Sequence, residues 1–210
     1  MPFFVALMSA VLALTFFDPA SAVPAPAADQ VFLKPSPTDI VGARACQTVY
    51  PSFIKPIFSW APDLSVSNTM PQSRLFEVQS SGPSQNWRQD SLLMFTGIPT
   101  GAYGCQLQYV FPSGFPISLY NHTQLYVYTT DRNATDSDTW NNSPKEKNQW
   151  GTANPSSGGS GVVNSQTCYE RLTYRIEIGH DSQPNAGRVS FYQTNGFTWP
   201  VAGWVLTHSC

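Results

Sequence analysis

The sequence predicts an all-β fold, an antiparallel β-sandwich or jelly roll. In several segments apolar residues alternate with polar ones at a period of two, which is typical of strands with one buried face. The segments between them are rich in turn residues, and the chain holds 14 glycines and 18 prolines. No stretch sustains an apolar helical face between capping residues. Many short strands joined by such turns favour a sandwich or jelly roll.

Five segments are expected to be strands. One of them places Leu172, Tyr174, Ile176 and Ile178 on one face. Glu177 falls on the opposite face, and we expect it to be solvated. A continuous apolar run at residues 92–95 predicts a central strand. The expected strands are residues 92–95, 105–111, 124–128, 172–178 and 188–192.

The N-terminus predicts export from the cell. Residues 3–17 contain no charge, and Ala20-Ser21-Ala22 follows them. This pattern indicates a secretory signal peptide cleaved after Ala22, although no Lys or Arg precedes the apolar run. An uncleaved anchor or a buried strand is the alternative, but a membrane span needs ~20 apolar residues. We therefore divide the chain into a signal peptide (1–22), a proline-rich arm (23–44) and one domain (45–210), with no membrane span after cleavage.

The cysteines support an extracellular location. All four follow the predicted cleavage site, and an even number in an exported chain indicates disulfides. Three pairings are possible, and we favour Cys168 with Cys210 and Cys46 with Cys105. We predict no metal site, because no CxxC motif is present.

Three sequons predict N-glycosylation at Asn121, Asn133 and Asn141. The last two lie in a polar segment, residues 131–166, that is rich in Ser, Gly and Asn. Long polar segments within compact domains are usually functional or disordered. We expect this segment to be a long flexible loop inserted between strands.

Composition and motifs exclude several functions. Charged residues make up 11% of the chain and its net charge is −2, so a basic surface for nucleic acid is absent. Neither HExxH nor GxSxG occurs. We predict no catalytic residue and no cofactor. The histidines and carboxylates are expected to be ordinary solvated side chains and not catalytic groups; these are His122, His180, His208, Asp131, Asp136, Asp138, Glu170, Glu177 and Asp181.

Two tryptophans suggest a binding surface. Trp140 and Trp150 lie in the polar segment, where no alternation assigns them to the core. An exposed indole can stack on a sugar ring, and large apolar side chains at a surface often mark a binding site. The alternative is that both rings fold back onto the sandwich and cover its edge. The other tryptophans, expected in the core or at its rim, are Trp60, Trp87, Trp199 and Trp204.

An ordered set of short words carries a family resemblance over residues 45–210. The words are Thr48-Val49-Tyr50-Pro51, Phe95-Thr96-Gly97-Ile98-Pro99, Gly104-Cys105-Gln106-Leu107, Ser165-Gln166-Thr167-Cys168, Val189-Ser190-Phe191-Tyr192-Gln193, and Ala202-Gly203-Trp204 before Cys210. In this order the chain resembles fungal secreted proteins of the "ubiquitin 3 binding protein, But-two C-terminal domain" family. The resemblance implies a secreted β-sandwich of undetermined activity, without established catalytic residues. The family name implies an intracellular partner in a ubiquitin-like pathway, which the signal peptide and cysteines argue against here.

These observations predict a secreted, non-catalytic β-sandwich glycoprotein at the cell wall or outside the cell. Its expected partner is an extracellular polysaccharide or another cell-wall component. One alternative is a secreted carbohydrate-active enzyme on a jelly-roll fold, which would need two close carboxylates. The other is an extracellular structural or host-interaction protein whose partner is a protein.

Overall fold

The computed structural model describes residues 46–83, 87–180, 185–196 and 200–210. The expected signal peptide and arm lie outside these residues, as do Asp181 and Trp199. Within the described residues, no helix is long and apolar enough to cross a membrane.

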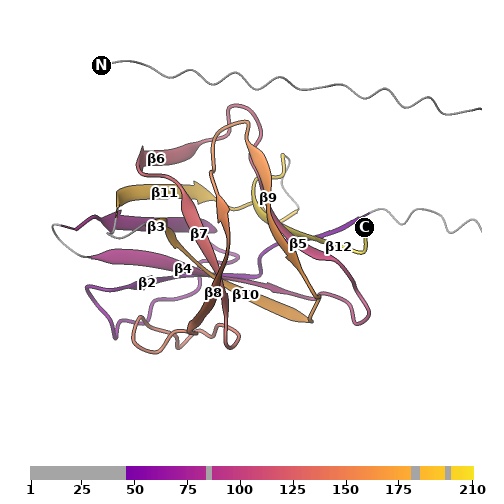
Figure 1. Ribbon diagram of the computed structural model, residues 1–210, viewed down its shortest axis with the longest axis horizontal. Coiled ribbons are helices and arrows are strands. Elements are labelled where there is room, and N and C mark those ends of the chain that lie inside the picture. Colours follow the sequence, from indigo (N-terminus) through magenta and orange to yellow (C-terminus); the bar gives the residue numbers. More distant parts are fainter. Residues whose placement is uncertain (1–45, 84–86, 181–184, 197–199) are drawn as a thin grey trace, which may run out of the picture. The chain divides into compact units, whose positions relative to one another are not determined.

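The described chain is all-β, with twelve strands in two antiparallel sheets that form a sandwich, so the predicted fold class is confirmed. In Figure 1, β6, β11, β3, β4 and β2 follow one another across one sheet, and β9, β5 and β12 lie together beside them. The strands are β1 (Gln47–Val49), β2 (Phe53–Phe58), β3 (Leu75–Ser81), β4 (Arg88–Thr96), β5 (Cys105–Val110), β6 (Ile117–Asn121), β7 (Leu125–Thr130), β8 (Glu146–Ala153), β9 (Ser160–Gln166), β10 (Arg171–Ile178), β11 (Ala186–Tyr192) and β12 (Gly203–His208).

The strand order brings distant parts of the chain together. The smaller sheet has the order β1-β12-β5-β9, and the larger has the order β6-β11-β3-β4-β10-β7-β8, with β2 also paired to β4. At the centre, β10 pairs with β4 on one side and with β7 on the other. Most neighbours in these sheets are therefore not consecutive in sequence.

The main core lies between the sheets and follows from the alternation. Leu93 and Phe95 of β4 are fully buried there, as are Tyr174 and Ile176 of β10. Trp204 of β12 is also fully buried, packed edge-on against neighbouring rings. Such aromatic packing contributes a large share of the apolar area that a core removes from water.

A second apolar cluster covers the opposite face of the larger sheet. It consists of Phe53, Ile57, Leu92, Met94 and Ala134, with Trp140 packed against it. Ala134 and Trp140 belong to the segment between β7 and β8, residues 131–145, so this segment lies over the sheet and is called the covering segment below. Strand β4 is consequently buried at every position from 89 to 95, which explains its continuous apolar run.

The structure corrects the expectation of one long loop over residues 131–166. Two strands, β8 and β9, occupy much of this segment, and only the residues before and between them are irregular. Most side chains of β8 are exposed, so the strand carries little apolar alternation. Its pairing with β7, rather than its burial, holds it in place. A pattern search that relies on buried side chains misses such a strand.

The structure also corrects the disulfide pairing. The bonds join Cys46 to Cys210 and Cys105 to Cys168. Strand β1 pairs with β12, which brings the first described residue beside the last. Cys105 opens β5 opposite Gln166 of β9, two residues before Cys168. These pairings depend on sheet order, which cysteine spacing does not reveal.

We predict that the Cys105→Ala/Cys168→Ala double variant is less stable than the wild-type protein. The bond closes a loop with a sequence separation of 63 residues, and a loop of that length predicts a loss of about 4 kcal/mol from the free energy of unfolding. Urea denaturation measures the loss. Peptide mapping without reduction provides the second check, and a peptide linking Cys46 to Cys105 contradicts the assignment.

Candidate functional site

The outer face of the larger sheet carries a network of ion pairs. Arg175 of β10 contacts two carboxylates: its Nη2 lies 2.6 Å from Oδ2 of Asp90, and its Nε lies 3.1 Å from Oε1 of Glu146. Arg88 Nη2 lies 3.2 Å from the same oxygen of Asp90 and also contacts Glu177. The strands β4, β8 and β10 thus contribute side chains to one connected cluster.

Within the described residues, the three carboxylates of this network are the group that most resembles an acidic reaction centre. Oxygens of Asp90, Glu146 and Glu177 all lie within 4.8 Å of one another. Asp90 and Glu177 are each 1% exposed. Buried charges are costly unless they are paired, and here each carboxylate contacts an arginine. The two arginines offset most of the charge of the three carboxylates, which indicates a structural role.

The position of Glu177 corrects the expectation that it is solvated. Its side chain does point away from the main core, as the alternation predicts, but the outer face is covered. Arg88 contacts one carboxylate oxygen, and His180 Nε2 lies 3.1 Å from the other. Asp90 is a second buried carboxylate that is not predicted from the sequence. The sequence feature that indicates its burial is the apolar run of β4, which is typical of a strand covered on both faces.

Trp140 and Trp150 pack against the sandwich. Arg175 and Arg88 lie over the Trp140 ring, with Cζ atoms 4.7 and 5.5 Å from its centroid. Guanidinium groups at such distances are attracted by the ring. Trp150 stacks on buried Tyr174, with centroids 5.2 Å apart. These contacts are the ones expected if both rings fold back, and both rings are partly buried.

Two aspartates fix the covering segment: Asp138 by contacts within the segment and Asp136 by a contact with β2. Asp138 is 1% exposed, and its Oδ1 lies 2.8 Å from Nη2 of Arg132. The Asp138 carboxylate also accepts hydrogen bonds from the backbone N–H and hydroxyl of Thr135. Asp136 instead uses its backbone carbonyl, which accepts a hydrogen bond from fully buried Lys55. Burial lowers the pKa of the Lys55 ammonium, while the Asp136 and Asp138 carboxylates oppose this shift.

The remaining sequence-selected polar residues are dispersed. His208 is buried next to Ser209, whereas His122 lies near β11 and His180 beside Glu177. Glu170 is exposed and accepts a hydrogen bond from Thr100, and Asp131 accepts one from the backbone of Lys145. None of these histidines belongs to a close group of potential metal ligands within the described ranges.

All three sequon asparagines are exposed. Asn121 ends β6, at the edge of the larger sheet. Asn133 and Asn141 lie in the covering segment. Asn141 donates a hydrogen bond to Asp63, whereas Asn133 accepts one from Thr173. Their exposure leaves each position accessible to a glycan.

An aromatic hollow of about 340 Å³ is lined by Trp60, Gln79 and Trp87. Trp60 is 50% exposed, its centroid lies 5.1 Å from that of Trp87, and the two rings meet at 77°. Phe58 supports Trp60 from a centroid distance of 4.8 Å. From the sequence both tryptophans are expected in the core or at its rim, so this hollow is not predicted. Their positions just after and just before strands, in turn-rich sequence, are the feature that could have identified them.

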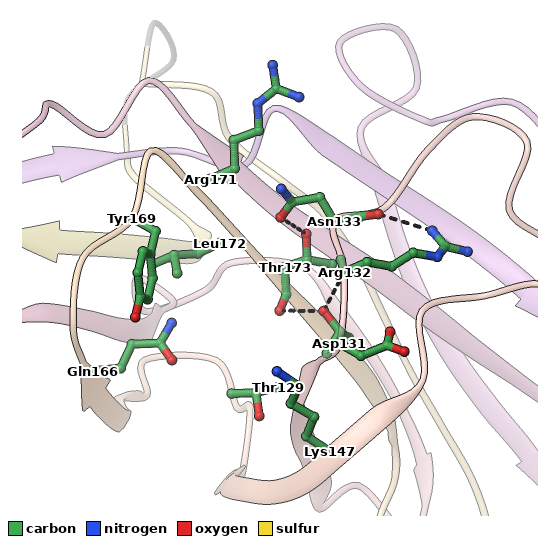
Figure 2. Close-up of a pocket in the computed structure, with 11 residues that line it drawn as sticks. Thr129, Asp131, Arg132, Asn133, Lys147, Gln166, Tyr169, Arg171, Leu172 and Thr173 are labelled. Carbon is green, nitrogen blue, oxygen red and sulfur yellow. Dashed lines mark hydrogen bonds between the residues drawn. The ribbon is translucent and has the colours of Figure 1, made fainter.

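A second, more polar pocket of about 390 Å³ lies where β7 and β10 meet the covering segment. Figure 2 shows Lys147 and Gln166 facing each other across it, with Tyr169 beside Gln166. Arg171 extends away from the middle of the group. The lining residues are Thr129, Thr130, Asp131, Arg132, Asn133, Lys147, Gln166, Tyr169, Arg171, Leu172 and Thr173.

One comparison with known proteins relates the chain to a family. The model of the family described as "Ubiquitin 3 binding protein But2 C-terminal domain" matches residues 50–196. The matched range begins just before β2 and ends after β11, so it includes the ion network, both hollows and the Cys105–Cys168 bond. No curated protein matches the chain.

We predict that Asp90→Asn destabilises the fold. The substitution leaves Arg88 and Arg175 without their shared carboxylate, and removing one member of a buried ion pair typically costs about 3 kcal/mol. Exposed Glu170 offers a matched control, since Glu170→Gln is expected to change the free energy of unfolding by less than about 0.5 kcal/mol. Urea denaturation compares the variants. Equal stabilities would show that the network contributes little to folding.

Proposed function

We propose that this chain, which belongs to the ubiquitin 3 binding protein But2 C-terminal domain family, is an exported, non-catalytic β-sandwich that binds glycans. The proposed partner is a polysaccharide of a cell wall or another extracellular surface. Trp60 and Trp87 would form its binding site.

Export is supported by chemistry at several positions. The two disulfides are typical of proteins that fold in an oxidising compartment. The three sequon asparagines are exposed, as glycosylation requires. The apolar N-terminal run of residues 3–17 is the separate, sequence-based reason for this proposal.

The single observation that carries glycan binding is the aromatic hollow. Half of the Trp60 surface is exposed even though Phe58 and Trp87 hold the ring in place. A rigid indole offers a large apolar face at a small entropic cost. Gln79 lies in the same hollow, and its Nε2 donates to Gln89. The Gln79 carbonyl oxygen can then accept a hydrogen bond from a sugar hydroxyl.

The carbohydrate-active enzyme is a weaker proposal. Glycoside hydrolysis needs one carboxylate as an acid and another as a base or nucleophile, on either side of the scissile bond. Asp90 and Glu177 are buried, and Arg88 contacts both of them. A substrate would have to displace both the arginine and the covering Trp140 to reach these carboxylates.

A protein partner is the second candidate function. The description of the matched family names a ubiquitin 3 binding protein, and this name motivates the candidate. Strand β6 supplies a suitable surface, because it lies at a sheet edge with Leu119 and Tyr120 exposed. An exposed edge strand can pair with an extended segment of another protein.

We predict that Trp60→Ala weakens retention of the secreted protein on its polysaccharide by about tenfold, because the stacking face is lost. A pull-down with insoluble cell-wall polysaccharides measures retention. Tyr103→Ala is the matched control, since Tyr103 is an exposed aromatic residue outside the hollow. If Trp60→Ala is retained as well as the wild-type protein, the assignment of the site is wrong. If no polysaccharide retains the wild-type protein, a protein partner becomes the better proposal.

A further inference from the structure

We infer that the polar pocket in Figure 2 binds the carboxylate of an acidic sugar through Lys147. This site is lined by residues entirely different from those of the aromatic hollow. The inference therefore does not require Trp60 to bind glycans. It rests on the charges, the unused hydrogen-bonding groups and the exposed ring that the pocket brings together.

The walls of the pocket are fixed by hydrogen bonds within the protein. The Thr130 hydroxyl lies 2.9 Å from the backbone carbonyl of Arg132 and 3.2 Å from that of Thr173, and it shares its one hydrogen between them. Thr173 in turn donates to Asn133. Gln166 donates to the hydroxyl of buried Tyr174 at 2.7 Å, which orients its amide toward the pocket. A ligand would thus enter a pocket whose walls are already organised.

The cations that line the pocket differ in whether their charge is compensated. Arg132 pairs with buried Asp138, so the carboxylate of Asp138 compensates the charge of Arg132. Lys147 and Arg171 are exposed and form no ion pair with the described residues. Asp131 is the one carboxylate in the lining. A chain with a net charge of −2 therefore has a local excess of positive charge here.

The remaining groups indicate a sugar acid. Lys147 points into the pocket and can donate a charge-assisted hydrogen bond to a carboxylate. Gln166 leaves its carbonyl oxygen free to accept a hydrogen bond from a ligand hydroxyl. Tyr169 is 65% exposed beside Gln166 and offers a flat ring to a pyranose. Arg171 extends away from the middle, so we expect it to attract an anion without direct contact.

Asn133 connects this pocket to glycosylation. Its side chain is part of the wall, and its carbonyl oxygen already accepts the hydrogen bond from Thr173. A glycan on the remaining amide nitrogen would lie at the pocket. Binding is therefore tested on protein with Asn133 unmodified, as mass spectrometry of the corresponding peptide can verify.

The experiment is an NMR titration of the full mature domain with glucuronic acid. We expect saturable shifts in the Lys147, Gln166 and Tyr169 signals, and little response to uncharged glucose. Lys147→Gln should weaken binding by roughly three- to tenfold, the range expected for a partly exposed charge pair. Lys145→Gln is the matched control, because Lys145 is an exposed lysine two positions away that does not line the pocket. Added salt should weaken wild-type binding by screening.

Three outcomes would overturn the inference. One is the absence of shifts in these residues with glucuronic acid. Another is equal weakening by Lys147→Gln and Lys145→Gln. The third is binding of inorganic phosphate as tight as that of glucuronic acid, which would identify a general anion site rather than a sugar-acid site. Titrating Trp60→Ala separates this test from the proposed function, since that variant should bind glucuronic acid like the wild-type protein.

Discussion

The need to cover both faces of the larger sheet constrains the rest of the structure. Its inner face packs on the smaller sheet, and the segment between β7 and β8 covers the centre of its outer face. This second layer has no regular structure of its own, so specific contacts must hold it. Trp140 supplies apolar contact with the sheet, while the pairing of Arg132 with Asp138 and the hydrogen bond from Lys55 to Asp136 fix the backbone. The domain thus buries charged side chains in order to attach a loop.

This covering layer also determines which polar groups can perform chemistry. Carboxylates under it lose their water and need cationic partners, which Arg88 and Arg175 provide. The same pairing makes the carboxylates poor candidates for proton transfer. Burial, with a further contribution from the Glu146 carboxylate, raises the pKa of nearby Tyr128 to about 12, so its hydroxyl stays protonated even in moderately alkaline solution. The groups that resemble a reaction centre are thereby held in a structural network.

Five of the twelve described strands could be predicted from the sequence, but the sheet order could not. Alternation located β5, β7, β10 and β11, because each has one face in the main core. Seven strands were not predicted, among them β8, whose side chains are mostly exposed, and Glu177 was placed in solvent because alternation cannot detect a covering loop. Disulfide pairing failed for a related reason, since β1 meets β12 across the whole domain. For the candidate site, the sequence predicts that tryptophans bind the ligand, but it points to the wrong pair. Trp140 and Trp150 stand in polar sequence yet are partly buried, whereas Trp60, which lines the proposed hollow, is half exposed.

The two proposed binding surfaces lie beside the covering layer rather than beneath it. The pocket of Figure 2 forms where the segment leaves β7 and where β10 begins, so its walls belong to the sheet and to the loop together. Trp60 lies two residues after the end of β2, and Trp87 directly precedes β4. At such positions strand pairing fixes the backbone while the side chain can remain in water. A domain that uses its buried charges for stability can therefore still present rigid groups to a ligand, at the ends of its strands.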